Sequence, residues 1–161
     1  MKTEKSTSSG LFFDCQPFRA WRYNETQINV SNVIAPPYDV ISPEKQKSLC
    51  ERSPYNVVRL ILNKKEDTDH EQNNAYTRAR DCLLDWRRKN ILIREEEPCF
   101  YVYRQTFKDP ASGQTKNRSA LLARVRLQPF ENGIIVPHEK TLRGPKVDRM
   151  NLLRMVKTNL S

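Results

Sequence analysis

The sequence predicts an α+β fold in which a mixed sheet, including an antiparallel hairpin, packs against helices. Apolar residues recur at helical spacing over residues 74–89, whereas aromatic residues alternate with other residues over residues 99–107. Hydrophobic residues make up 37% and charged residues 29% of the 161 residues, a composition typical of globular rather than disordered chains. This length suits one ordinary domain with a core of its own.

One globular region is expected over residues 12–161, preceded by a flexible tail over residues 1–11. The apolar run Leu11-Phe12-Phe13 is shorter than the ~7–15 apolar residues of an export signal. No apolar run reaches the ~20 residues that span a bilayer. We therefore expect a cytoplasmic protein, and its four widely spaced cysteines should be free thiols.

The first half of the chain predicts two strands and a helix between them. Residues 12–21 carry apolar side chains in imperfect alternation, which indicates a strand. A helix should start at Ser42-Pro43, where serine can cap it and proline fits its first turn, and run to about Glu51. Residues 56–62 (NVVRLIL) are apolar and rich in β-branched side chains, so they predict a buried strand.

The second half predicts a long helix, a hairpin and a final helix. The long helix runs from about Asn74 to Lys89. Its inward face is Tyr76, Ala79, Leu83 and Trp86. Residues 99–107 and 119–127 predict an antiparallel hairpin, because a turn-forming cluster at residues 109–113 separates them. The final helix starts near Pro145. Its expected inward residues are Val147, Met150, Leu153 and Val156.

The aromatic strand at residues 99–107 allows two interpretations. Aromatic residues at every second position usually pack into a core with a neighbouring strand, and this is our expectation. They could instead form a surface on which nucleic-acid bases stack. The formal charge of +9 favours some anionic partner, such as a nucleotide, a phosphorylated metabolite or a nucleic acid, without choosing among them.

The best candidate site is the segment 137–149, which follows a short apolar run and leads into the final helix. Free N–H groups at a helix start attract phosphate, and Gly144 lets the backbone approach a ligand. The candidate substrate- and phosphate-binding residues here are Lys140, Thr141, Arg143, Lys146, Asp148 and Arg149. His138 and Glu139 are the candidate catalytic residues, because a carboxylate near cations stays ionised and can accept a proton. Alternatively, Glu139 forms a surface ion pair with Arg143 or Lys146.

A second candidate loop, residues 35–41, contributes Tyr38 and Asp39 to the expected binding site. Its two prolines could stiffen the wall of a pocket, or could simply form a rigid turn before the next helix. His70 and His138 have no metal-ligand spacing, either with each other or with the cysteines, so no metal held by histidine or cysteine is expected.

Several segments together resemble the family known as domain of unknown function ten-fifteen. They are residues 33–42 (VIAPPYDVIS), 52–56 (RSPYN), 100–105 (FYVYRQ), 137–141 (PHEKT) and 144–149 (GPKVDR). Members of this family are longer and continue into a half that carries an Asp-Gly-His-His-Arg motif. The resemblance therefore implies that this chain corresponds to the amino-terminal part of a longer protein.

The His-Glu loop and that later motif are in turn similar to the ParB/sulfiredoxin superfamily, which includes free-serine kinases. This similarity implies that Glu139 accepts the proton of a substrate hydroxyl and that His138 helps to place it. Lys146, Asp148 and Arg149 match the polar start of the following helix.

The parent protein would then be a nucleotide-dependent kinase of a small hydroxyl metabolite such as free serine. It would use ATP or ADP with Mg²⁺, and this chain would be an inactive or partial portion. Two alternatives stay open: a basic nucleic-acid-binding module of the ParB kind, and a non-catalytic regulatory or interaction protein.

Overall fold

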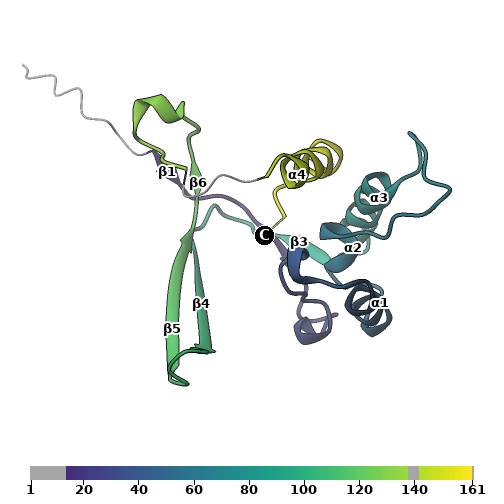
Figure 1. Cartoon of the computed structure of the whole chain (residues 1–161), viewed down its shortest axis with the longest axis horizontal. Coiled ribbons are helices and arrows are strands. Elements are labelled where there is room, and N and C mark those ends of the chain that lie inside the picture. The colour runs from purple at the N-terminus through teal and green to yellow at the C-terminus, as the bar shows by residue number, and fades with distance from the viewer. Residues whose placement is uncertain (1–13, 138–141, 161) are drawn as a thin grey trace, which may run out of the picture. The chain divides into compact units, whose positions relative to one another are not determined.

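A computed structural model describes residues 14–137 and 142–160. Over these residues the chain is a mixed α+β protein with four α-helices and three two-stranded antiparallel sheets (Figure 1). Contacts group the chain into two compact units, Met1–Ala20 with Glu95–Lys140 and Trp21–Arg94 with Thr141–Ser161. The expected tail lies outside the described residues. No helix in the described part is long and apolar enough to cross a membrane.

The strands form separate pairs, so the expected mixed sheet is not found among the described residues. The pairs are β1 (Cys15–Gln16) with β6 (Arg124–Val125), β2 (Trp21–Tyr23) with β3 (Leu92–Arg94), and β4 (Tyr101–Lys108) with β5 (Thr115–Leu122). The strand predicted over residues 12–21 is broken near Pro17, which has no N–H to donate to a ladder. Beyond it, Phe18 and Cys99 exchange two backbone hydrogen bonds of 3.0 Å.

Two helices begin where the sequence predicts them. α1 (Pro43–Arg52) starts after Ser42, whose side chain accepts a hydrogen bond from the Lys45 backbone N–H at 3.2 Å. α3 (Ala75–Arg88) is capped by Asn74 and ends before Asn90, whose φ of 56° lies in the left-handed region. Asparagine adopts this conformation more readily than most residues, which explains why the helix stops there.

The predicted strand at residues 56–62 is wrong, because this segment forms the short helix α2 (Val58–Ile61). Asn56 is fully buried, and its side-chain oxygen accepts from the Val58 N–H at 3.0 Å. Its side-chain amide donates to the backbone carbonyls of Asn32 and Ile34. These local bonds provide a helical start that competes with strand pairing, and a short apolar run does not distinguish the two.

The unit formed by Trp21–Arg94 and Thr141–Ser161 is called the helical unit below. Its hydrophobic core joins α2, α3, β3 and the second half of α4 (Arg143–Val156). Its buried residues are Leu60, Ala79, Leu83, Trp86, Ile91, Leu92, Leu152 and Val156. The predicted inward face of α4 is wrong except at Val156, because Val147, Met150 and Leu153 are 51%, 47% and 43% exposed. A spacing of three residues drifts by ~60° per step around an α-helix, so Val147 and Val156 lie on opposite sides.

The predicted hairpin is present, with a shifted second strand. β4 pairs with β5 from Tyr101↔Leu122 to Lys108↔Thr115, so β5 starts earlier than the predicted residue 119. The expectation that the aromatic residues of segment 99–107 form a core is wrong for three of the four, since Phe100 and Tyr103 are each 49% and Phe107 39% exposed. Beyond Leu122 the chain leaves β4 and forms β6, which pairs with β1.

Candidate functional site

The structure brings together the two loops that the sequence indicates separately. Tyr38 lies in a short 3₁₀ turn, Tyr38–Val40, that follows Pro37. The guanidinium carbon of Arg149, in α4, lies 4.0 Å from the centroid of the Tyr38 ring. This distance is that of a cation–π contact. Tyr38, Asp148 and Arg149, all named from the sequence, therefore belong to one cluster in the helical unit.

Hydrogen bonds of Arg149 and Asp148 connect the first half of α4 to α2 and α3 of the helical unit. Arg149 donates to Asp148 through Nε at 2.9 Å and through Nη2, and its Nη1 donates to the Ile61 carbonyl at 2.7 Å. Tyr76, at the start of α3, donates its hydroxyl to Asp148 Oδ1 at 2.8 Å. The partners of both predicted site residues are thus protein groups, which gives them a clear role in placing α4.

Electrostatics keeps the Asp148 carboxylate ionised. Partial burial acts to raise the pKa of Asp148, but hydrogen bonds from Arg149 and Tyr76 outweigh it, and the pKa falls below its usual value. The positive charge of Lys65 adds to this effect. Burial, together with the neighbouring Asp148, raises the pKa of the Tyr76 hydroxyl. Tyr76 therefore stays protonated and can keep donating to the carboxylate.

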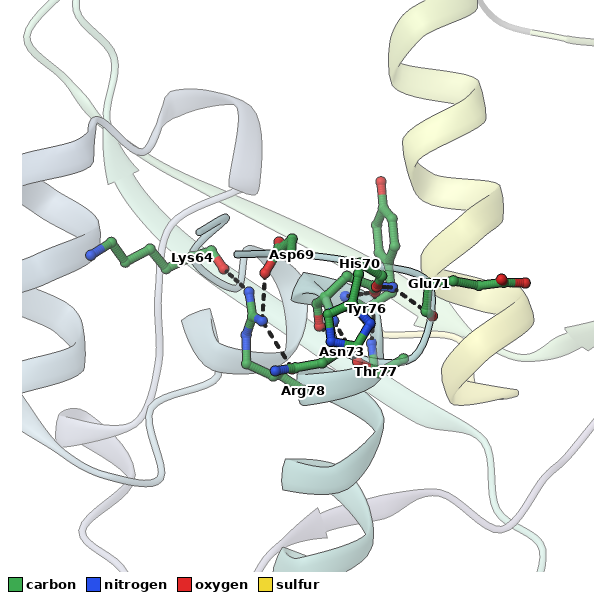
Figure 2. A network of polar contacts seen from close by, with 9 residues as sticks. Lys64, Asp69, His70, Glu71, Asn73, Tyr76, Thr77 and Arg78 are labelled. Atoms are coloured by element: carbon green, nitrogen blue, oxygen red, sulfur yellow. Dashed lines mark hydrogen bonds and ion pairs between the residues drawn. The ribbon is translucent and has the colours of Figure 1, made fainter. Parts of the chain in front are cut away.

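A charged loop, residues 63–74, is held against the start of α3 (Figure 2). Arg78, in α3, makes the main contacts with this loop. Its Nη1 donates to Asp69 at 2.6 Å, and its Nη2 donates to the Lys64 carbonyl at 2.6 Å. The Asn74 side chain also donates to the carbonyls of His70 and Glu71. Hydrogen bonding from Arg78 lowers the pKa of the Asp69 carboxyl. The loop is therefore an ordered part of the same helical unit.

The start of α4 is exposed and cationic. Its first residues follow Leu142, and no side chain of the described residues caps it. Arg143, Gly144 and Lys146 are exposed, and the first turn contains no acid. The helix dipole and unpaired N–H groups at such a start favour an anion, and two nearby cations strengthen this preference. Asp39 is exposed as well and has no polar partner within the described ranges.

Four predicted site residues, His138, Glu139, Lys140 and Thr141, lie outside the described residues. Tyr76 was missed as a site residue, because helical spacing assigned it to the apolar face of α3. Lys65 was missed as well, since it lies in a segment with many charges of both signs. Only the Asn74-x-x-Thr77 pattern, typical of a helix start, marked this region in the sequence.

An open hollow of about 470 Å³ lies elsewhere in the helical unit. Its lining residues are Pro54, Tyr55, Arg59, Asp81, Cys82, Asp85, Trp86 and Lys89. Pro54 and Tyr55 belong to the segment 52–56 (RSPYN) named above, and none of the other lining residues is one that the sequence singles out for function. Across residues 14–137 and 142–160, no group of three histidine, cysteine or acidic side chains could hold a metal ion.

One family model, described as a protein of unknown function (DUF1015), matches residues 15–161 of the chain. This range includes both loops of the cluster around Tyr38 and Arg149. No curated protein and no solved structure matches the chain. The comparisons therefore show no similarity to ParB or sulfiredoxin proteins.

Proposed function

The chain belongs to the DUF1015 family of proteins of unknown function, and we propose an activity for it. In this proposal the protein is a kinase of a small hydroxyl metabolite, and the start of α4 binds the phosphates of the nucleotide. Free serine is the first candidate substrate. The observation that carries the proposal is the cationic start of a long helix, which no described side chain caps and whose seventh residue, Arg149, contacts the Tyr38 ring. Such a start has the charge and the N–H donors that a phosphate group requires.

Arg143 and Lys146 are the phosphate-binding residues in this proposal. Both are exposed, and neither forms an ion pair with another described residue. A nucleotide would bring Mg²⁺ bound mainly by its own phosphates, and the exposed Asp39 carboxylate is an oxygen ligand of the kind that Mg²⁺ accepts. The residues present therefore fit ATP or ADP with Mg²⁺, which would supply the phosphoryl group and neutralise its charge.

Asp148, Tyr76 and Arg149 act as positioning residues in this proposal. Their hydrogen bonds fix the first half of α4 to α2 and α3, so the phosphate-binding turn keeps one orientation. A fixed arrangement of donors lowers the cost of organising the site when the ligand binds. Tyr38 forms the aromatic side of the same arrangement through its contact with Arg149.

The proton-accepting role falls to Glu139, and this step rests on the resemblance to free-serine kinases. The substrate hydroxyl oxygen attacks the terminal phosphorus, its proton passes to the Glu139 carboxylate, and the bond to the bridging oxygen breaks. The shortened nucleotide leaves as the phosphomonoester forms. His138 would help to orient the glutamate or the substrate.

A binding experiment tests the role of the helix start directly. In calorimetric titration with Mg-ATP, we expect Arg143→Ala/Lys146→Ala to weaken binding about tenfold or more, because charge-assisted bonds to phosphate are lost. The matched control is Lys45→Ala/Lys47→Ala, which removes two exposed lysines of α1. Equal affinity for the wild-type chain, the double variant and the control would contradict the proposal.

A second experiment tests the chemistry. Phosphorus NMR would follow Mg²⁺, ATP or ADP and free serine with this chain and with a longer family member. We expect a phosphomonoester signal from the longer protein, lost when its match to Glu139 is changed to glutamine. Nucleotide binding without any phosphomonoester, from serine or from other hydroxyl metabolites, would favour a regulatory protein instead.

A further inference from the structure

The β4–β5 ribbon, residues 101–122, has exposed side chains on both faces. One face presents Tyr103 and Phe107, which are 49% and 39% exposed. The opposite face presents Val102 and Leu121, which are 71% and 60% exposed. An isolated two-stranded hairpin is at best marginally stable in water, so eight paired positions with two open faces indicate a surface that another molecule covers.

The strand register places cations beside the aromatic rings. Lys116 pairs directly with Phe107, and Arg118 pairs with Gln105. Because side chains on directly opposite residues share one face, the aromatic face also carries these two cations. Tyr103 lies on the same face as Phe107, four residues away, or about 14 Å along the strand. One face therefore offers two separated rings with basic groups between and beside them.

Most of the positive charge on this part of the chain is not neutralised locally. Over residues 101–126 there are six basic residues and one acid, Asp109. The six are Arg104, Lys108, Lys116, Arg118, Arg124 and Arg126. Lys116 forms an ion pair with Asp109, and Arg118 donates to the Gln105 side-chain oxygen at 2.8 Å. Arg104 and Lys108 lie on the opposite face, with Val102, and their exposed side chains have no polar partner in the part that the structure describes.

We propose that the aromatic face of the β4–β5 ribbon binds single-stranded nucleic acid. Exposed rings stack on bases, and lysine and arginine side chains contact the phosphates between them. A base pair in a duplex hides its faces, so a duplex would gain little from Tyr103 and Phe107. A second copy of the chain would bring two ribbons of like charge together, which is unfavourable for directly opposed strands.

This surface does not depend on the proposed phosphate site at α4. Its residues belong to the other compact unit, and no step of the phosphotransfer proposal uses them. Failure of one proposal therefore leaves the other untouched, and the two can be tested with separate variants of the same chain.

The test is fluorescence anisotropy with a labelled single-stranded oligothymidine and a labelled duplex of the same length. We expect Tyr103→Ala/Phe107→Ala to weaken binding of the single strand about tenfold or more, because two stacking contacts are lost. Lys116→Ala/Arg118→Ala, which removes the two cations of the aromatic face, should make the salt dependence shallower by about one unit of slope for each phosphate contact removed. The control is Lys45→Ala/Lys47→Ala, which removes two exposed charges from the helical unit.

Because all four ribbon residues are exposed, these variants should keep the wild-type circular dichroism spectrum. Absence of single-strand binding at about 50 mM salt would overturn the proposal. Binding that is equal for duplex and single strand, and unchanged in the aromatic variant, would overturn it as well, since it would reflect charge alone. A wild-type dimer in sedimentation velocity that the aromatic variant abolishes would assign the surface to a second copy instead.

Discussion

α3 and α4 have the same length, 14 residues, and pack against each other, but they begin in opposite ways. Asn74 accepts hydrogen bonds from the N–H groups of Tyr76 and Thr77, and Thr77 Oγ1 accepts from the Asn74 N–H. Burial on α3 also starts with its first residue, Ala75. α4 has no described side-chain cap, and its buried residues, Leu152 and Val156, lie in its second half.

The difference separates residues needed for folding from residues available for binding. The start of α3 is fixed by caps and by contact with the core, so its sequence serves the fold. The first turn of α4 contributes neither, and the contacts described for that half of the helix are the hydrogen bonds of Asp148 and Arg149 and the packing of Arg149 on Tyr38. Its exposed cations therefore have no structural task in the described residues, which is why we assign them to a ligand.

The strongest test of this comparison is a pair of truncations, one on each helix. Trp86→Ala on α3 should lower the free energy of unfolding by about 3–5 kcal/mol, because the indole is 2% exposed in the core. Val147→Ala on α4 should change it by less than about 0.5 kcal/mol. Urea unfolding followed by circular dichroism measures both. Comparable losses would mean that the first half of α4 is packed as tightly as α3.

Removal of the cap should produce the next largest effect. Asn74→Ala is expected to lower the free energy of unfolding by about 1–2 kcal/mol, because N–H groups in the first turn of α3 lose their acceptor. Asn74→Asp should retain most of the wild-type free energy of unfolding, since aspartate caps a helix as well as asparagine does. Leu142→Ala is the matched change on α4 and should have no such effect. A loss at Leu142 as large as at Asn74 would remove the contrast.

The Asp148 anchor predicts a pH dependence. Since folding lowers the pKa of Asp148, its contribution is complete above the unfolded pKa of about 3.9 and is lost as pH falls through the lower folded value. Asp148→Asn should therefore cost about 1 kcal/mol at pH 7, a modest value because the pair with Arg149 is partly exposed.

Urea midpoints at pH 7 and near pH 2 measure this difference between the wild-type chain and the variant. Other carboxylates titrate in both proteins, so only the gap between the two curves reports on Asp148. A gap that stays constant as the pH falls would show that the ion pair does not anchor α4.

The smallest predicted effect comes from giving α4 a side-chain cap, which none of the described residues supplies. Leu142→Asp should raise the free energy of unfolding by a few tenths to about 1 kcal/mol, because aspartate can cap the helix and complements its dipole. The same change should weaken phosphate binding, since a fixed carboxylate then occupies the place of the ligand. Melting temperature and Mg-ATP titration measure the two outcomes. A gain in stability with unchanged nucleotide affinity would move the phosphate site away from this turn.

Local chemistry made α1 and α3 predictable from the sequence. Ser42 and Asn74 mark the two helix starts, and Asn90 marks the end of α3 through its own backbone preference. The hairpin was predictable for the same reason, because turn-forming residues separate its strands. The predictions that were wrong concern segments whose secondary structure depends on contacts with residues distant in the sequence. Asn56 converts an apolar run into α2 by bonding to Asn32 and Ile34, which no short-range pattern reveals.

Some residues of the candidate site could be predicted from the sequence, and others could not. The sequence identified Tyr38 and Arg149 through their own loops, and the structure shows that they touch. Tyr76 was assigned to the apolar face of its helix, because spacing predicts the direction of a side chain and not the partner of its hydroxyl. Its bond to Asp148 joins positions 72 residues apart in the chain. Long-range polar pairs of this kind leave no periodic signal.

The order of the chain also has a consequence for its synthesis. The helical unit consists of Trp21–Arg94 and Thr141–Ser161, with Glu95–Lys140 between them. On the ribosome, the apolar face of α3 emerges well before Leu152 and Val156, which complete its core. At about 5–20 residues per second, this delay is on the order of seconds. The nascent chain therefore passes through a stage at which Ala79 and Leu83 are not yet covered by Leu152 and Val156. A chaperone that binds short apolar segments would bind the chain at this stage.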